Sequence, residues 1–166
     1  MNSDVPSGLK ILLGVKGNYT LLIYVKTCKK ISVGGLGTND FHEGYYVYTG
    51  SAFGNGSSSL GGRVKRHIRK QKIRRWHIDY LLSDEDVFLK AVVASAMEQR
   101  VECTINKHLK EVFQCQIPVY GFGSSDCRQN CGSHLLYLRR DTCEIVEKIA
   151  EVYLHVSGAE IIVLKL

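Results

Sequence analysis

The chain has 166 residues, of which 45% are apolar and 23% charged, and its formal net charge is +6. This composition is that of a soluble globular protein and excludes a disordered chain, and the length predicts one domain over residues 1–166. The apolar runs are too short to cross a bilayer, and the start MNSDVPSGLK has no signal-peptide pattern. We therefore expect a cytoplasmic protein whose six cysteines are thiols or metal ligands rather than disulfides.

The first half of the chain predicts strands. YTLLIYV at residues 19–25 is rich in branched and aromatic residues, and a shorter strand is expected from Lys30 to Val33. GYYVYTG follows at residues 44–50. The alternation of side chains along a strand places Tyr46 and Tyr48 on one face, with Tyr45 and Val47 on the other.

A helix is predicted after the Gly/Ser-rich stretch at residues 50–62, starting near Leu60. Val64 and Ile68 are its expected packing positions. Arg63, His67 and Lys70 recur at helical spacing and share a different face. The segment WHIDYLL at 76–82 then returns to the core, with Trp76, His77 and Asp79 interpreted as a buried polar anchor rather than a catalytic group.

The positive charge is concentrated in one segment. RVKRHIRKQKIRR, residues 63–75, holds eight Lys or Arg and no acidic residue, which exceeds the net charge of the whole chain. Such a run favours binding of a polyanion, most commonly nucleic acid, although a solvated helix face is the alternative. The residues expected to contact phosphates are Lys65, Arg66, Arg69, Lys70, Lys72, Arg74 and Arg75.

The second half predicts a long helix, from about Asp86 or Ala94 to Phe113, with an apolar stripe that includes Met97, Val101 and Ile105. Glu98, Glu102 and Asn106 lie beside that stripe at intervals of four residues. After the turn GFGSSDC, HLLYLRR at 134–140 and EIIVLKL at the end predict strands, while CEIVEKIAEVY is compatible with a helix or a strand.

Tyrosines on strands, an arginine on a basic helix and a later glutamate are the residue types that phosphodiester hydrolysis requires. The reaction needs a base for the water proton, a cation for the developing phosphate charge, and a divalent metal. Mg²⁺ is held by few carboxylates together with water and substrate oxygens, so one glutamate can suffice. Each residue type alone also has a structural explanation.

The order of these segments resembles the GIY-YIG nuclease superfamily. KGNYTLLIYV, GYYVYTGSA and GGRVKRHIR match its successive motifs, with GNY and YTG in place of GIY and YIG. WHIDYLL, the ECTINKHL helix and GFGSSDC followed by SHLLYL resemble its Uri-superfamily endonuclease-like branch. The resemblance spans residues from about Gly14 to Leu138.

This resemblance implies a set of catalytic residues. Tyr19 and Tyr48 occupy the tyrosine positions of the two strand motifs, Arg63 matches the helix arginine, and His67 the polar residue one turn later. Glu102 is the expected ligand of Mg²⁺ or Mn²⁺, with Glu98 as the alternative. An unperturbed tyrosine has a pKa near 10, so a base role for Tyr19 requires a nearby cation. Tyr45 and Tyr46 are explained equally well by packing.

The stretch DCRQNCGSH places Cys127, Cys131 and His134 within one turn. These three residues would bind Zn²⁺ if a fourth ligand, such as Cys115 or Cys143, folded back onto them. The spacing is only half of a zinc motif, so the sequence favours an ordinary turn with less than one equivalent of zinc.

Together the sequence predicts a single small α/β domain with a central mixed or antiparallel sheet flanked by helices. It predicts a Mg²⁺- or Mn²⁺-dependent endonuclease that acts on duplex or branched DNA, and it leaves a protein partner unknown. The alternatives are a non-catalytic nucleic-acid-binding module that uses a basic helix at 61–75, and a zinc-dependent structural or RNA-associated protein.

Overall fold

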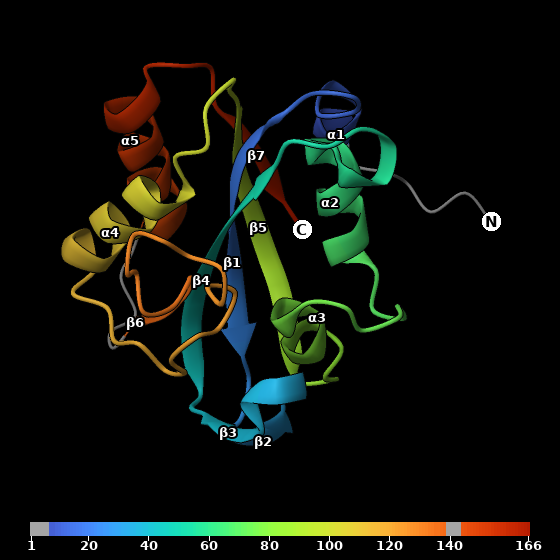
Figure 1. The fold of residues 1–166 in the computed structure, drawn as a ribbon, viewed down its shortest axis with the longest axis vertical. Coiled ribbons are helices and arrows are strands. Elements are labelled where there is room, and N and C mark those ends of the chain that lie inside the picture. The colour runs from blue at the N-terminus through green and yellow to red at the C-terminus, as the bar shows by residue number, and fades with distance from the viewer. Residues whose placement is uncertain (1–6, 139–143) are drawn as a thin grey trace.

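The computed structural model describes residues 7–138 and 144–166. Its centre is a five-stranded sheet of order β6-β4-β1-β5-β7, in which every neighbouring pair is antiparallel (Figure 1). The strands are β1 (Gly17–Val25), β4 (Gly44–Ala52), β5 (Val87–Ala96), β6 (Leu135–Leu138) and β7 (Ile162–Lys165). The predicted α/β class is thus confirmed, and the sheet is the antiparallel one of the two forms that the sequence left open.

Helices cover both faces of this sheet, as Figure 1 shows. One layer holds α1 (Ser7–Ile11), α2 (Leu60–Ile68) and α3 (His77–Leu82), and the other holds α4 (Glu102–Val112) and α5 (Ile145–Ser157). A hairpin of β2 (Lys29–Ser32) and β3 (Thr38–Phe41) and two 3₁₀ turns, Gly34–Leu36 and Gly56–Ser58, complete the elements. Within the described ranges, every helix is too short or too polar to cross a membrane.

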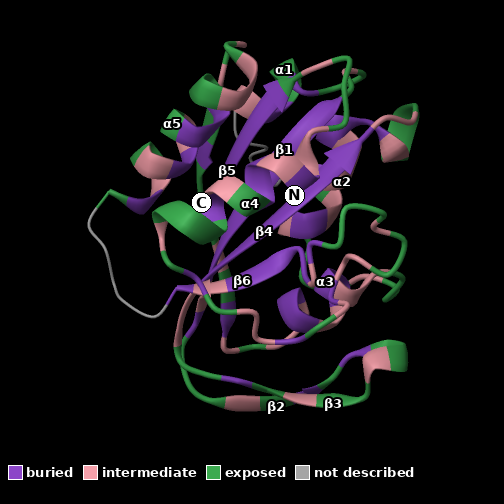
Figure 2. Ribbon diagram, turned by 60° about the vertical axis from the view of Figure 1, so that its left-hand side comes forward, coloured by how far each residue is buried: buried purple, intermediate pink, exposed green. Residues whose placement is uncertain are grey.

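The sheet separates two apolar clusters, so its central strands are buried on both faces (Figure 2). Tyr46 and Tyr48 belong to the cluster beneath α2 and α3, whereas Val47 belongs to the cluster beneath α4 and α5, against which Tyr45 also packs. The predicted alternation along 44–50 is therefore confirmed. Val64 is fully buried and Ile68 packs against the first cluster, as expected for this face of α2.

The long helix predicted from Asp86 or Ala94 to Phe113 is wrong in its first part. Residues 87–96 form strand β5, and α4 begins only at Glu102. β5 lies between β1 and β7, with residues 91–95 all buried. A strand buried on both faces is apolar throughout, so its pattern cannot be distinguished from that of a buried helix.

The basic helix predicted over 61–75 is shorter than expected. α2 ends at Ile68, and Arg69 is already extended, with φ −70° and ψ 125°. The chain then folds back over α2, because Arg66 donates to the carbonyl oxygen of Ile73 at 2.5 Å and Lys72 donates to that of His67 at 3.1 Å. The segment CEIVEKIAEVY, residues 143–153, was compatible with a helix or a strand, and its residues 145–153 belong to helix α5, while Cys143 lies outside the described residues.

Candidate active site

A pocket of about 460 Å³ opens at the edge of the sheet. β6 pairs with β4 only from Tyr45 to Tyr48, so the rest of β4 continues past the end of β6. Side chains from both helical layers meet there. The pocket is lined by Tyr19, Tyr48, Gly50, Ser51, Arg63, Arg75, Trp76, His77, Arg100, Glu102, Gly123, Ser125, Asp126 and His134. Four of the five predicted catalytic residues are in this set.

The fifth predicted residue, His67, lies directly behind the pocket. Its Nε2 is 2.9 Å from the Tyr19 hydroxyl, and both side chains are buried. Gly50, opposite Tyr19 in the β1–β4 register, makes this position possible. A Cβ at residue 50 would lie 2.6 Å from the Tyr19 hydroxyl oxygen, so any larger residue would displace the phenol.

Burial sets the protonation states of these groups. It lowers the pKa of His67 to about 3, with the charge of Lys72 acting in the same direction, so the imidazole is neutral at pH 7. Burial also raises the pKa of Tyr19 to about 12, although the positive charge of Arg63 opposes this shift. The Tyr19 hydroxyl is therefore protonated and shares a hydrogen bond with a neutral His67. The pKa of Tyr48 is likewise raised by burial.

Arg63 is held over the pocket by Trp76, whose ring centroid lies 4.7 Å from the guanidinium carbon. Arg66 lies against the same ring at 4.8 Å and donates to Asp79 at 2.7 Å. Asp79 is fully buried and also accepts from the backbone N–H groups of Arg75 and Trp76. Hydrogen bonds to a carboxylate at the start of a helix fix that start, so Asp79 is the predicted polar anchor and joins α2 to α3. Trp76 and His77, which were predicted to be buried with it, are only half-buried and line the pocket.

Glu102, the first residue of α4, brings the only carboxylate of that helix's first turn to the pocket. Its Oε1 accepts from the Ser51 hydroxyl at 3.0 Å, and Ser51 in turn accepts from Arg100 at 3.2 Å. Its Oε2 is buried and has no hydrogen-bond partner among the described residues. Glu98, the alternative, is exposed and lines shallow surface pockets with Met97 instead.

A buried asparagine fixes the loop that precedes Glu102. The Asn18 side chain donates to the carbonyl oxygen of Gln99 at 2.9 Å and accepts from the N–H of Val101 at 3.2 Å. Its neighbour Tyr19 faces the pocket. Asn18, Ser51 and Arg100 help to shape this candidate site but were not predicted, because single polar residues in strands and loops carry no recognisable spacing.

The loop at residues 119–134, here called the cysteine loop, forms the remaining wall. The N–H of Gly123 donates to His77 Nδ1 at 3.1 Å, which ties this loop to α3. Gly123 has φ +67°, and a Cβ there would lie 2.7 Å from the Tyr48 ring. The GFGSSDC turn therefore requires glycine both for its backbone and for the close approach of Tyr48.

The predicted phosphate-binding residues fall into two groups. Lys65, Arg69, Arg74 and Arg75 are exposed, and Arg75 also lines the pocket. The other three already have intramolecular partners: Arg66 binds Asp79, Lys72 donates to His67, and Lys70 donates to the carbonyl oxygens of Asp84 and Val87. The pocket itself contains three arginines against Glu102 and Asp126.

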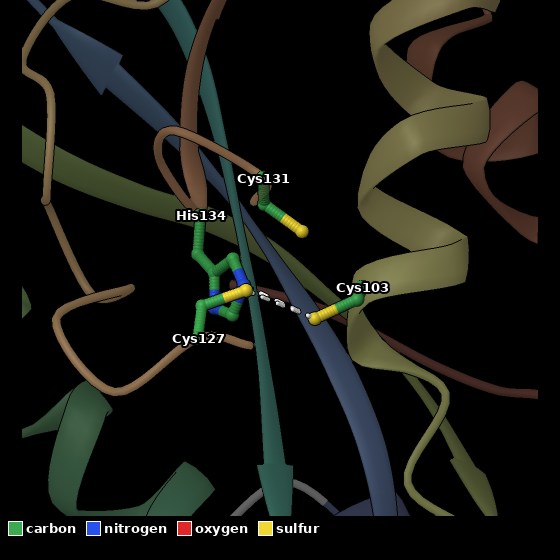
Figure 3. Close-up of side chains that lie close together, drawn as sticks. All are labelled: Cys103, Cys127, Cys131 and His134. Carbon is green, nitrogen blue, oxygen red and sulfur yellow. Dashed lines mark hydrogen bonds between the residues drawn. The ribbon is translucent and has the colours of Figure 1, made fainter. Parts of the chain in front are cut away.

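A second group of side chains, the thiol cluster, lies next to this pocket (Figure 3). It consists of Cys103, Cys127, Cys131 and His134, whose ligand atoms all lie within 4.8 Å of one another and could hold a metal ion. The fourth member is thus Cys103 of α4. The candidate Cys115 was wrong, because its thiol is buried elsewhere and donates to the carbonyl oxygen of Leu109, and Cys143 lies outside the described residues.

The sheet, its two helical layers and this pocket define a small α/β domain with a polar, arginine-rich site at the sheet edge. The family model described as Domain of unknown function DUF123 matches residues 18–156, and the chain belongs to that family. Comparison with curated proteins and with solved structures gave no match.

Proposed function

We propose that the pocket is the catalytic site of a metal-dependent endonuclease of the GIY-YIG type that hydrolyses DNA phosphodiester bonds. The observation that carries this proposal is the meeting of Tyr19, Tyr48, Arg63 and Glu102 around one pocket, although they come from β1, β4, α2 and α4. A structural explanation of each residue separately does not account for their convergence on one polar surface.

Glu102 fits the role of ligand to Mg²⁺ or Mn²⁺. Its Oε2 is a buried carboxylate oxygen that lacks a partner within residues 7–138 and 144–166, and such an atom is costly unless a cation or water satisfies it. Ser51 holds the other oxygen and so orients the carboxylate. When bound, a divalent cation supplies charge stabilisation at a phosphate oxygen and completes its coordination with water and substrate.

Tyr19 and His67 would act as a pair on the attacking water. At pH 7, deprotonating a group whose pKa is about 12 costs roughly 7 kcal/mol, so Tyr19 is no preformed base. The hydrogen bond to His67 holds the Tyr19 hydroxyl in place, and Tyr19 lines the pocket, where its oxygen would bind the attacking water. Tyr19 would thus orient the water, and the positive charge of Arg63, which acts to lower the Tyr19 pKa, would favour its action as a base.

Arg63 would stabilise the charge that develops on the phosphate. Its guanidinium is oriented by Trp76 and borders the same pocket as Tyr19 and Glu102. Its Nε is buried and unpaired among the described residues, which leaves it a donor without an internal partner. A planar guanidinium binds two phosphate oxygens at once, and this interaction strengthens as negative charge grows.

The experiment is nicking of supercoiled and branched DNA with Mg²⁺ or Mn²⁺. Tyr19→Phe removes one hydroxyl and should lower the cleavage rate by about 10²–10⁴-fold, as expected for a general acid–base group. Tyr45→Phe is the matched control, because Tyr45 packs on the opposite face of β4 and should cleave like the wild type. Failure of the wild-type protein to cleave any of several DNA structures would favour the non-catalytic binding module.

A further inference from the structure

We propose that Cys103, Cys127, Cys131 and His134 bind one Zn²⁺ in a closed structural site that joins the first turn of α4 to the cysteine loop. The four residues come from two separate parts of the chain. Cys103 is the second residue of α4, whereas the other three lie within eight residues of one another before β6. Figure 3 shows their side chains converging from these two parts.

The spacing of the ligand atoms fits tetrahedral zinc. Bond lengths of about 2.3 Å to sulfur and 2.0–2.1 Å to nitrogen give edges of about 3.8 Å between two sulfurs and 3.6 Å between sulfur and nitrogen. The sulfurs of Cys103 and Cys127 are 3.5 Å apart, and Cys103 Sγ is 3.6 Å from His134 Nε2. A disulfide is excluded at this separation, because its sulfur atoms lie about 2.05 Å apart.

The chemistry of the ligands selects the metal. Three thiol sulfurs and one imidazole nitrogen are soft or borderline ligands and favour Zn²⁺ over Mg²⁺, which prefers oxygen. With four protein ligands the coordination sphere is complete, as in structural zinc sites, whereas catalytic zinc keeps one position for water. The thiol cluster therefore serves the fold rather than the chemistry of the neighbouring pocket.

The cysteine loop has a specific need for such a cross-link. Residues 119–134 contain no helix or strand, yet Phe122 within them is fully buried. The loop is closed by backbone hydrogen bonds from Gly121 to Gly132 and from His134 to Phe122, at 2.7 and 2.9 Å. Its described ties to α4 are the thiol cluster and one bond from Asn106 to Ser133, at 2.8 Å. Irregular loops of this length are uncommon in compact domains, and a bound metal would add a cross-link that holds this one against α4.

The position of the cluster also links zinc to the pocket. Glu102 immediately precedes Cys103, Asp126 immediately precedes Cys127, and His134 lines the pocket itself. Zinc would therefore fix two acidic residues that border the cavity. This last consequence rests on the function proposed above, whereas the zinc site itself does not.

The test is the zinc content of the full chain, purified under reducing conditions and measured by atomic emission without DNA or Mg²⁺. We expect about one equivalent, and after Zn²⁺ is replaced by Co²⁺ we expect the thiolate-to-cobalt charge-transfer absorption of a tetrahedral site. Cys103→Ser should lower the zinc content at least tenfold. Cys115→Ser is the control, because it changes a buried thiol outside the cluster and should retain the full equivalent.

Two further variants distinguish the loss of a zinc ligand from misfolding of the chain. His134→Cys keeps four soft ligands and should retain zinc, whereas His134→Ala should lose it. A wild-type protein that stays below a tenth of an equivalent after reconstitution with excess Zn²⁺ would overturn the proposal. Equal losses in Cys103→Ser and Cys115→Ser would also overturn it. Because no step measures cleavage, an inactive nuclease would leave this result unchanged.

Discussion

The pocket has two walls, and the contacts that hold each wall differ in kind. On the wall made by α2 and α3, Asp79 is fully buried and binds Arg66, while Trp76 packs against Arg63. On the wall made by α4 and the cysteine loop, the corresponding tie is the thiol cluster. One wall is thus organised by the protein alone, whereas the other is expected to need a metal.

This contrast is sharpest at two adjacent residues. Glu102 and Cys103 begin the same helix, and neighbouring helical residues point about 100° apart, so they serve different surroundings. Glu102 offers a hard oxygen to an open pocket, whereas Cys103 offers sulfur to an enclosed cluster. A single turn of helix can therefore present ligands for two metals of different chemistry.

The largest expected effect is that removal of zinc loosens the wall made by α4 and the cysteine loop and leaves the wall made by α2 and α3 unchanged. Structural zinc binds zinc-finger peptides with about 10–16 kcal/mol, more than most single contacts supply. A chelator should therefore speed hydrogen exchange at the amides of Gly121 and His134, which close the cysteine loop. The amide of Ser83, which bonds to Asp79, should exchange at an unchanged rate. Equal acceleration on both walls, measured by mass spectrometry, would contradict the contrast.

The next largest effect is a loss of stability when the ion pair in the wall made by α2 and α3 is broken. Asp79→Asn removes the charge that Arg66 faces, and breaking a buried ion pair from one side costs about 3–5 kcal/mol. Urea unfolding should show a loss of that size. Asp40→Asn is the control, because its pair with Lys30 is exposed and should contribute at most about 1 kcal/mol. A loss below 1 kcal/mol for Asp79→Asn would mean that α2 and α3 are held together by other contacts.

The Asp79–Arg66 ion pair also predicts that the free energy of unfolding depends on pH. Burial alone would raise the pKa of Asp79, but hydrogen bonds from Trp76, Arg66 and Arg75 lower it overall. A carboxyl whose folded pKa is depressed stabilises the protein above its unfolded pKa of about 3.9, and this contribution disappears as pH falls through the folded pKa. The stability difference between wild type and Asp79→Asn should therefore shrink in urea titrations below about pH 4.

Features that depend on neighbouring residues could be predicted from the sequence, whereas features that depend on contacts between distant residues could not. The tyrosine alternation in β4 and the packing positions of α2 depend on neighbouring residues, and both were predicted. β5 was mistaken for helix because a strand buried on both faces lacks a distinguishing period. Tyr19, Tyr48, Arg63 and Glu102 were named through the order of motifs, yet their meeting at one pocket required the fold.

The thiol cluster shows the limit most clearly. Cys103 lies 24 residues before Cys127, on a helix, and only the packing of α4 beside the cysteine loop brings their sulfurs together. Within the sequence, Cys103 has no spacing that distinguishes it from Cys115 or Cys143, the two cysteines that were considered as the fourth ligand. Asn18 and Arg100 were missed for the same reason, since their partners lie far away in the chain.

The smallest expected effect concerns binding outside both walls. Arg69 and Arg74 are exposed, and each phosphate contact contributes about 0.9 to the log–log salt slope of DNA affinity. Replacing both with alanine should flatten that slope by up to about 2 in an anisotropy titration. Alanine at the exposed Lys110 and Lys165, on α4 and β7, should leave it unchanged. An unchanged slope in the arginine variant would identify the basic segment as a solvated surface.

The most direct test of the central claim measures two properties of one variant, Glu102→Gln, beside Glu98→Gln. Glutamine can still accept from Ser51 but loses the carboxylate charge that a divalent cation requires. We predict that Glu102→Gln loses Mg²⁺-dependent DNA nicking by at least about 10²-fold while it keeps one equivalent of zinc, and that Glu98→Gln changes neither. Wild-type nicking in Glu102→Gln, or its loss in Glu98→Gln alone, would contradict the assignment of the pocket.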